Sequence, residues 1–242
     1  MGFNRFNSKN NGFTLAEVLI TLGIIGVVAA MTLPTLIQNH QKRSLEVATQ
    51  KFYSTMSQAV KKYMADEGVD DLRNTPLASD NYEDFDSPEA IASIRNFVTK
   101  YLKVVEECDH EANNCFAPVY KSWDGSAPDY NFTTEANRSG RRDYVLSDGV
   151  VIRISYWNYQ ESPIDLYVDI NGKKGPNRVG YDLWAMSIFY DGSIDESTVF
   201  PEYKNEQNFS RDTREQRFET CKDGAYGGCF GHFLENNFKF DY

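Results

Sequence analysis

The segment GFTLAEVLITLGIIGVVAAMTLPTLI, residues 12–37, sets the organisation of this chain. Its apolar part, Phe13–Ile37, holds one charged side chain, Glu17, in 25 residues. A helix of that length rises about 1.5 Å per residue, so it is about 37 Å long and can cross a hydrocarbon core about 30 Å thick. A charge at mid-bilayer depth costs about 2.5–3.5 kcal/mol. Glu17 lies near the end of the run, where the cost is smaller, but its presence in an apolar helix still requires a physical reason. We expect that reason to be a partner supplied by another copy of such a helix.

A short polar leader precedes this run. Residues 1–12 carry two charges, both basic, and end in Gly12, which Phe13 follows. The order is therefore a basic leader, a Gly–Phe junction, an acidic residue and an apolar helix. This order resembles the N-terminal signal of the prepilin family, which comprises type IV pilins and type II secretion pseudopilins. Pro34 corresponds to a proline that members of this family often carry in the apolar helix.

The resemblance implies how the N-terminus is processed. In the prepilin family a membrane-embedded prepilin peptidase cuts after the glycine and methylates the residue that becomes the new N-terminus. This implies a cut after Gly12, methylation of Phe13, and an assembly role for Glu17. After cleavage, the amine of Phe13 and the carboxylate of Glu17 can pair between neighbouring subunits, which would fix their register.

The resemblance also implies a location and partners. The apolar helix would hold the chain in the bacterial inner membrane as a single-pass protein. The remainder would lie in the periplasm or another extracytoplasmic space until assembly into a filament. The implied partners are prepilin peptidase, other pilin-like subunits in a helical filament, and an inner-membrane assembly platform. Small residues would let neighbouring helices approach closely; they are Gly23, Gly26, Ala29 and Ala30.

Two other interpretations of this segment stay open. A secretory signal peptide also has a basic start, an apolar core and small residues before its cut, and Val28-Ala29-Ala30 fits such a site. Against it, the apolar run continues to Ile37, and an acidic residue inside the core is atypical. The second alternative is a plain single-span anchor that is neither cut nor assembled.

The prepilin resemblance implies a structural role without enzymatic activity. The expected function is that of a subunit of a type II secretion pseudopilus, or of a type IV pilus-like filament, which supports protein secretion across the outer membrane. Two alternatives remain: a pilus subunit for adhesion or DNA uptake, and a membrane-anchored extracytoplasmic enzyme. For catalysis, the sequence lacks a Gly-x-Ser-x-Gly nucleophile elbow and a Gly-x4-Gly-Lys-[Ser/Thr] phosphate loop.

Composition restricts the range of partners. The formal net charge is −10, and removal of the leader with its two basic residues makes it −12. An acidic surface opposes electrostatic attraction to nucleic acid, so no bulk nucleic-acid binding is expected, although a local basic patch is compatible with this composition.

We expect one nearly continuous helix from Phe13 to about Ala65. It divides into a transmembrane and assembly half, 13–37, and an amphipathic half, 38–65. Pro34 lacks a backbone N–H and should kink this helix or open one turn. In the second half, apolar residues recur at steps of three and four, which indicates a helix with one buried stripe. These residues are Leu45, Ala48, Phe52, Met56, Ala59, Val60 and Tyr63.

The remaining residues, 66–242, should form an extracytoplasmic globular domain. We expect an α+β fold in which the long helix packs on an antiparallel sheet, as in pilins. After an acidic loop, Ser87 and Pro88 should begin a second amphipathic helix that ends near Glu107, because serine is a good N-cap and proline suits the first helical turn.

Alternating apolar residues separated by turn dipeptides predict an antiparallel meander of about four strands. The strands are expected at 143–146, 150–157, 164–170 and 182–190, with turns at Asp148-Gly149, Asn171-Gly172 and Asp191-Gly192. About forty residues at the C-terminus are polar with scattered aromatic side chains, and we expect them to wrap the sheet.

Four cysteines fall into two local pairs: Cys108 with Cys115, and Cys221 with Cys229. In an exported domain, oxidation to disulfides is expected, and proximity favours these pairings, although four cysteines allow three connectivities. Metal binding is the alternative, because His110 and His232 lie close to the cysteines in the sequence. Their spacing does not match the paired Cys-x2-Cys pattern of common zinc sites.

The loop from Asp169 to Asp182 is rich in oxygen ligands and turn-forming residues. Some pseudopilin globular domains bind calcium in a loop near the sheet, and the resemblance makes Asp169, Asn171 and Asp182 candidate calcium ligands. Calcium takes six to eight oxygens, and this loop lacks the EF-hand spacing. Three basic residues inside the loop would also repel a cation. The alternative is a structured turn in which the Asp and Asn side chains bond to nearby backbone. No other cofactor is implied.

Overall fold

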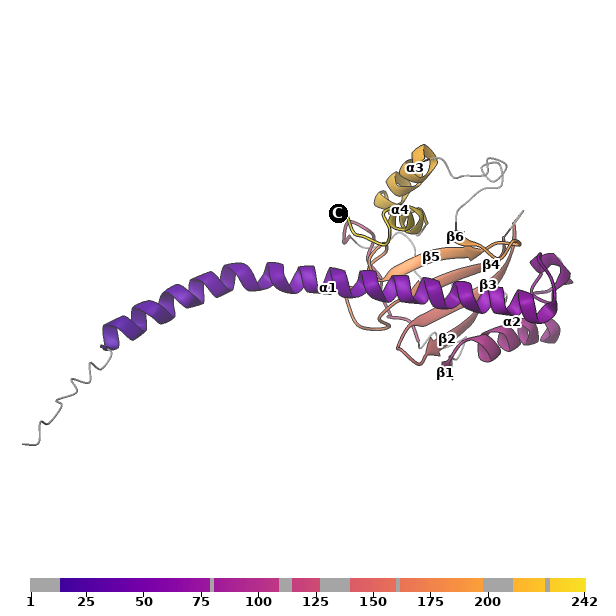
Figure 1. Ribbon diagram of the computed structural model, residues 1–242, viewed down its shortest axis with the longest axis horizontal. Helices are drawn as coiled ribbons and strands as arrows, with labels where there is room; N and C mark the ends of the chain where they lie inside the picture. Colours follow the sequence, from indigo (N-terminus) through magenta and orange to yellow (C-terminus); the bar gives the residue numbers. More distant parts are fainter. Residues whose placement is uncertain are drawn as a thin grey trace, which may run out of the picture. The chain divides into compact units, whose positions relative to one another are not determined.

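The computed structural model describes residues 14–78, 81–108, 115–126, 140–159, 162–197, 211–224 and 227–242. The chain forms two compact units, Met1–Arg43 and Ser44–Tyr242. Helix α1, Leu15–Glu67, begins in the first unit and continues into the second (Figure 1). We call the second unit, Ser44–Tyr242, the head.

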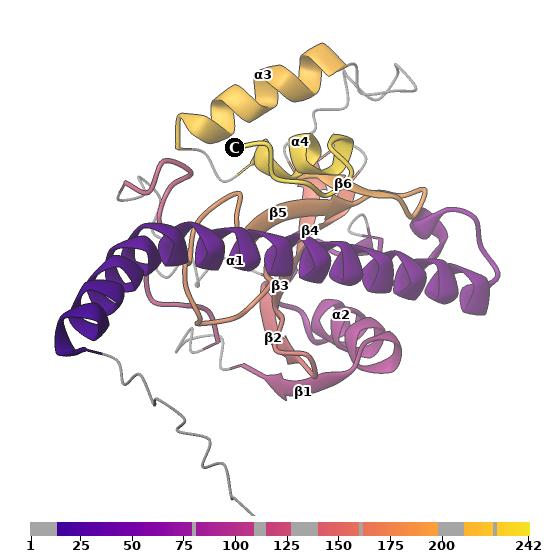
Figure 2. The same cartoon turned by 60° about the vertical axis from the view of Figure 1, so that its left-hand side comes forward.

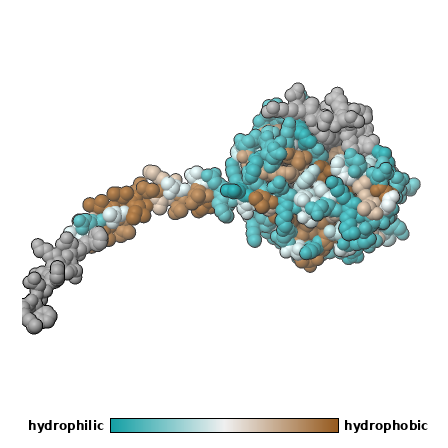
Figure 3. Space-filling view, viewed as in Figure 1, coloured by the Kyte–Doolittle hydropathy of each residue, from teal (hydrophilic) through white to brown (hydrophobic). Residues whose placement is uncertain are grey.

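The part of α1 in the first unit is apolar and exposed. Its large hydrophobic side chains, from Leu15 to Ile37, are 41–78% exposed in the isolated chain. Figure 3 shows them as a largely brown, hydrophobic surface. Among the described residues, α1 is the one helix that is long and apolar enough to cross a membrane. Its α-helical conformation continues through Pro34, so no turn opens there.

The second half of α1 packs on the head as an amphipathic helix, and Figure 2 shows it crossing one face of the sheet. Its buried stripe consists of Leu45, Thr49, Phe52, Met56, Ala59, Val60, Tyr63 and Met64. These positions recur at steps of three and four, so one face of the helix is buried away from water. This burial stabilises the fold by about 25 cal/mol per Å² of apolar area. The predicted stripe is confirmed. After α1 ends, the loop contains a short 3-10 helix, η1, Leu72–Asn74.

Helix α2, Pro88–Tyr101, begins where the sequence predicts it. The hydroxyl of Ser87 accepts a hydrogen bond from the N–H of Ala90 at 3.3 Å, as an N-cap does. The predicted end near Glu107 is wrong, because Val104–Glu107 forms strand β1. Its β-branched residues fit a pleated strand, and pairing with the next strand supplies hydrogen bonds between two chain segments.

Six strands form one antiparallel sheet in the order β1-β2-β3-β4-β5-β6. After β1 they are β2 Arg142–Leu146, β3 Val151–Tyr159, β4 Ser162–Asp169, β5 Leu183–Ile188 and β6 Ile194–Glu196. The predicted meander corresponds to β2–β5, and the sheet has one further strand at each edge. Gly149 and Gly192 lie in the predicted Asp-Gly turns at φ of +88° and +76°, a backbone conformation that favours glycine.

The C-terminal part contains two helices that the sequence did not predict: α3, Arg211–Lys222, and α4, Cys229–Glu235. Helix α4 packs on β5 and β6, and its Phe233 stacks on Trp184 with ring centroids 4.6 Å apart. The segment after α4 then returns to α1, where the N–H of Phe240 donates to Glu46 Oε1 at 2.9 Å. The described aromatic residues therefore cover the sheet, as predicted.

Candidate functional site

The first turn of α1 contains a reciprocal pair, Thr14 and Glu17. Glu17 Oε2 accepts hydrogen bonds from the backbone N–H and the hydroxyl of Thr14, at 2.8 and 2.9 Å. The Thr14 hydroxyl in turn accepts from the N–H of Glu17 at 3.2 Å. This arrangement is a capping box, which satisfies N–H groups that the first turn of a helix leaves open. A carboxylate there also interacts favourably with the positive end of the helix dipole.

The capping box gives Glu17 a structural contact that the sequence prediction missed. The Thr-x-x-Glu pattern is visible in the sequence, but the prediction rested on the charge of Glu17 alone. Gly12 and Phe13, the predicted processing residues, lie outside the described residues. Their roles, and the role of Glu17 in assembly, stay predictions. Because Glu17 contacts the backbone of Thr14, its carboxylate lies within one residue of the N-terminus that cleavage after Gly12 would create.

Small residues leave part of the apolar helix surface open. At Gly23 and Gly26, an added Cβ would meet no heavy atom within 4 Å. Helical spacing places Ala30 on the same face as these two glycines. A second helix can approach such a face closely, because no side chain separates the two backbones.

Both predicted disulfides are present: Cys108–Cys115 and Cys221–Cys229. Their sulfurs are therefore not available to bind a metal ion. His232 makes other contacts, with Nε2 3.0 Å from Asp241 Oδ1 and its ring stacked on Phe218 at 3.9 Å. His110, the other histidine of the metal alternative, lies outside the described residues. The second disulfide joins α3 to α4 and so fixes these two helices together.

The predicted calcium ligands lie in the turn between β4 and β5. Asp169 accepts hydrogen bonds from the hydroxyl of Tyr120 and, at 3.1 Å, from the N–H of Asn171. The carboxylate of Asp182 accepts from the N–H groups of Asn177 and Arg178, at 2.7 and 2.6 Å. Both carboxylates therefore already bond to local groups, as a structured turn requires.

Burial dominates the electrostatics of this turn. It raises the pKa of Asp169 to about 8 and the pKa of Asp182 to about 6. The side-chain oxygen of Asn171 is buried without a hydrogen-bond partner. Within the described ranges, no group of three His, Cys, Asp or Glu side chains is placed to hold a metal ion. Calcium binding here stays a prediction.

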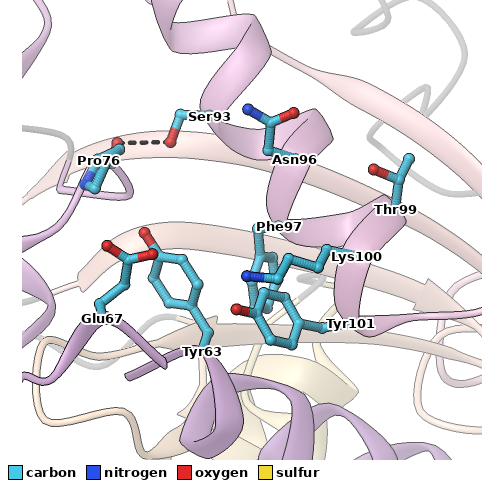
Figure 4. A pocket seen from close by; sticks show the side chains of 9 residues that line it. All are labelled: Tyr63, Glu67, Pro76, Ser93, Asn96, Phe97, Thr99, Lys100 and Tyr101. Atoms are coloured by element: carbon cyan, nitrogen blue, oxygen red, sulfur yellow. Dashed lines mark hydrogen bonds between the residues drawn. The ribbon is translucent and has the colours of Figure 1, made fainter. Parts of the chain in front are cut away.

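A pocket of about 370 Å³ lies in the head between the end of α1 and α2 (Figure 4). Three aromatic rings line it, and the ring of Tyr63 meets that of Phe97 edge-on at 5.4 Å. The lining also contains one carboxylate, Glu67, and one amine, Lys100, which lies over the ring of Tyr101 at 5.0 Å. The hydroxyl of Ser93 donates to Pro76 O at 2.7 Å, so this possible nucleophile bonds to a backbone carbonyl and not to a base.

Comparison with known proteins assigns the chain to a family. Residues 35–162, more than half of the chain, match a model described as "Family of unknown function (DUF6613)". The chain belongs to this family. The part shared with the DUF6613 family begins within α1 and ends at the start of β4. Residues 7–33 match a second model, described as "Prokaryotic N-terminal methylation motif", and this range includes Gly12, Phe13 and Glu17.

This DUF6613 family member is also similar to a pilin. It is 34% identical over 67 residues to "Type IV major pilin protein PilA" of Myxococcus xanthus (strain DK1622). That match covers 28% of this chain and 30% of the pilin. No solved structure matches the chain. The methylation motif and the pilin similarity confirm the prepilin resemblance. The long apolar helix followed by an antiparallel sheet confirms the pilin-like α+β fold.

Proposed function

We propose that this chain is the precursor of a structural subunit in a type IV pilin-like filament. The observation that carries this proposal is the methylation motif at the start of an exposed apolar helix, in a chain that also forms a folded head. A helix with so much apolar surface is stable only where lipid or other apolar helices surround it. Membrane residence followed by filament assembly supplies both surroundings.

Processing would convert the precursor into the assembly-competent form. Prepilin peptidase would cut after Gly12 and methylate the amine of Phe13. A methylated amine keeps its positive charge, so the mature chain would start with a cation next to the capping turn. The chain would then carry opposite charges, the amine and Glu17, at one end of its apolar helix.

The role of Glu17 would be to select one register between neighbouring subunits. An ion pair buried away from water loses hydration, so the pair adds little net stability. A buried charge that has lost its partner destabilises the assembly by about 3–5 kcal/mol. Packing arrangements that leave Glu17 of one subunit away from the Phe13 amine of another are therefore disfavoured.

The apolar helix can change its surroundings without exposing polar groups. The hydroxyls of Thr21 and Thr32 donate to backbone carbonyls four residues earlier, each at 2.9 Å. They are therefore satisfied both in lipid and among other helices. The open face at Gly23 and Gly26 would let a neighbouring helix come close once lipid is exchanged for protein.

The proposal fixes a location and a set of partners. The precursor would be a single-pass protein of the bacterial inner membrane, with its head in the periplasm or another extracytoplasmic space. Its partners would be the prepilin peptidase, an inner-membrane assembly platform and other pilin-like subunits. The chain itself would have no enzymatic role.

Within this class, the filament would be a type II secretion pseudopilus or a type IV pilus-like filament, whose subunits support protein secretion across the outer membrane. A pilus subunit for adhesion or DNA uptake is the second candidate, and the similarity to a type IV major pilin favours it. Cells that lack the chain distinguish the two. Loss of secreted proteins with surface filaments intact supports the pseudopilus, whereas loss of surface filaments with attachment or DNA uptake supports the pilus.

The N-terminus of the natural product tests the proposal. Mass spectrometry of membranes and of sheared filaments should find a chain that begins with N-methylated Phe13. Gly12→Val should accumulate precursor, because a branched side chain before the cut hinders the peptidase, and Asn10→Ala serves as a control in the leader. A natural product that begins at Met1 or Met31 contradicts the proposal.

A further inference from the structure

Three lysines form what we call the basic end of the head: Lys121, Lys173 and Lys174. Two of them lie in the β4–β5 loop. Two backbone hydrogen bonds hold Lys121 beside that loop, from its N–H to Asn177 O at 2.8 Å and from Val179 N–H to its carbonyl at 3.0 Å. All three are exposed, and in the part of the chain that the structure describes none of their ammonium groups pairs with a carboxylate.

The segment 66–89 forms what we call the acidic end. Nine of its 24 residues are Asp or Glu, and Arg73 is its one basic residue. Local ion pairs use some of these carboxylates, such as Asp66, whose Oδ1 lies 3.1 Å from Lys62 Nζ. Others are exposed and pair with no basic side chain of the described residues; they are Glu67, Asp70, Glu83, Asp84 and Glu89.

The two ends lie at opposite ends of the β3–β4 hairpin (Figure 2). The loop with Lys173 follows Asp169, which pairs with Val151 at the start of β3. The acidic end lies at the other end of β3, where the hydroxyl of Tyr156 donates to Pro76 O at 3.3 Å. Five residues of strand separate these two positions, about 17 Å at 3.4 Å per residue.

We propose that the basic end of one subunit docks on the acidic end of the next subunit in the filament. This inference rests on the proposed function, because it needs copies packed side by side. The head contains 21 basic and 34 acidic residues, a net charge of −13, so copies repel one another unless opposite charges face each other at the contact. The basic end gives each copy three lysines, without carboxylate partners among the described residues, to place against the acidic end of its neighbour.

These contacts would determine how neighbouring heads are oriented more than how strongly they bind. Charges separated by more than about 8 Å are largely screened at physiological salt, so only direct head-to-head contact matters. Exposed ion pairs contribute about 0.2–1 kcal/mol each, whereas like charges in contact are unfavourable. Docking the basic end of one copy on the acidic end of the next places lysines against carboxylates and keeps the two acidic ends apart.

A nucleic acid is the other polyanion that the basic end could meet. Three lysines can neutralise about three phosphates, a small number in a head that is otherwise strongly acidic. A second copy of the chain offers five carboxylates that pair with no basic side chain among the described residues, on a surface whose position is fixed by the fold. The observations therefore favour the second copy, and nucleic acid becomes an outcome of the test.

Charge reversal in the full-length protein tests the contact. Lys173→Glu/Lys174→Glu should lower the yield of sheared filaments about tenfold, because two attractions become repulsions. Asp70→Lys/Glu83→Lys should do the same, and neither residue makes a side-chain contact that the fold needs. Combining the four substitutions should restore most of the yield. The matched control is Lys61→Glu/Lys103→Glu, which reverses two exposed lysines that belong to neither end and should assemble like wild type.

Carbodiimide cross-linking supplies a second measurement, since it joins an amine only to a carboxylate that touches it. Filaments grown from mixed light and heavy isotope subunits should yield mixed peptides that join Lys173 or Lys174 to an acid of the segment 66–89. Wild-type filaments without such links, or a reversed variant that assembles normally, overturn the contact and leave the filament role intact. Normal assembly with lost DNA retention would assign the basic end to nucleic acid instead. Absence of filaments from wild type contradicts the proposed function itself.

Discussion

Arg153 on β3 and Asp143 on β2 lie directly opposite each other and form two parallel hydrogen bonds. Arg153 Nε lies 2.8 Å from Asp143 Oδ1, and Nη2 lies 2.7 Å from Oδ2, with each side chain 2% exposed. The guanidinium also lies 5.0 Å from the ring centroid of Phe116, which follows Cys115 in the chain. The buried ion pair and the first disulfide therefore hold the same loop against the sheet.

Removing one member of this pair should destabilise the head strongly. Arg153→Met leaves the carboxylate of Asp143 buried without its partner, and we expect the free energy of unfolding to fall by about 3–5 kcal/mol. Arg153→Met/Asp143→Leu removes both charges and should recover most of that loss. Urea unfolding of the full chain in detergent measures both. If the double variant is as unstable as the sum of the two single variants, the pair is not coupled.

The sequence predicted the parts of the fold that local patterns determine. The stripe on α1, the N-cap at Ser87 and the Asp-Gly turn at Gly149 each depend on residues a few positions apart. Strand β1 does not, because Val105 continues the apolar spacing of α2, and Val104 becomes part of a strand only through its pairing with Leu146, far along the chain. Helix α3 was missed because it is almost entirely polar, with few buried residues to reveal a helical period.

The functional residues also divide into those that local sequence reveals and those that only the fold brings together. Glu17 was found because a charge inside an apolar run has no local explanation. The basic end was not found, because Lys121 joins Lys173 and Lys174 only through a bridge between distant parts of the chain. In the sequence, the lysines of the β4–β5 loop indicate only that a cation would be repelled there. Their lack of carboxylate partners among the described residues and their distance from the acidic end are properties of the folded head.

The second disulfide should stabilise the C-terminal helices. Cys221→Ser/Cys229→Ser removes the covalent link between α3 and α4, and we expect a loss of about 2–4 kcal/mol in the free energy of unfolding. Protease cleavage within α3 should become faster, because the helix is otherwise polar and weakly packed. The matched variant Cys108→Ser/Cys115→Ser should leave cleavage in α3 unchanged. Equal sensitivity of α3 in both variants would contradict a local role for this disulfide.

Stability should depend on pH through buried acids. Burial raises the pKa of Asp169 to about 8 and the pKa of Glu196 to about 7. In the unfolded chain such groups titrate near pH 4. Between about pH 4 and these raised values the unfolded state loses protons that the folded state keeps, so the free energy of unfolding falls as pH rises.

We therefore expect a higher melting temperature at about pH 5 than at about pH 8. Asp169→Asn should flatten the upper part of this profile, because the amide does not titrate. Asp148→Asn, at an exposed turn, is the control and should leave the profile unchanged. A melting temperature that increases steadily towards pH 8 would rule out this linkage.

Chelation tests the calcium prediction. Because Asp169 and Asp182 already accept hydrogen bonds from local groups, we expect the melting temperature to be the same with added calcium and with chelator. A binding ligand stabilises the folded state in proportion to the logarithm of its concentration over Kd. A calcium-dependent rise that Asp182→Asn abolishes would show that the turn opens to bind the ion.

Substitutions at Glu17 and Thr14 separate the charge of Glu17 from its capping contact. Glutamine also completes a capping box, so Glu17→Gln keeps the start of the helix and removes only the charge that the Phe13 amine requires. We expect normal membrane insertion and cleavage, but a loss of filaments about as large as in Glu17→Ala. Thr14→Val keeps the charge, removes the hydroxyl of the capping pair and should assemble nearly normally. The measurements are the filament yield relative to the membrane pool and the mass of the mature N-terminus. Because register depends on the pair and helix initiation depends on the cap, full assembly of Glu17→Gln together with failure of Thr14→Val would assign Glu17 to the cap and remove it from assembly.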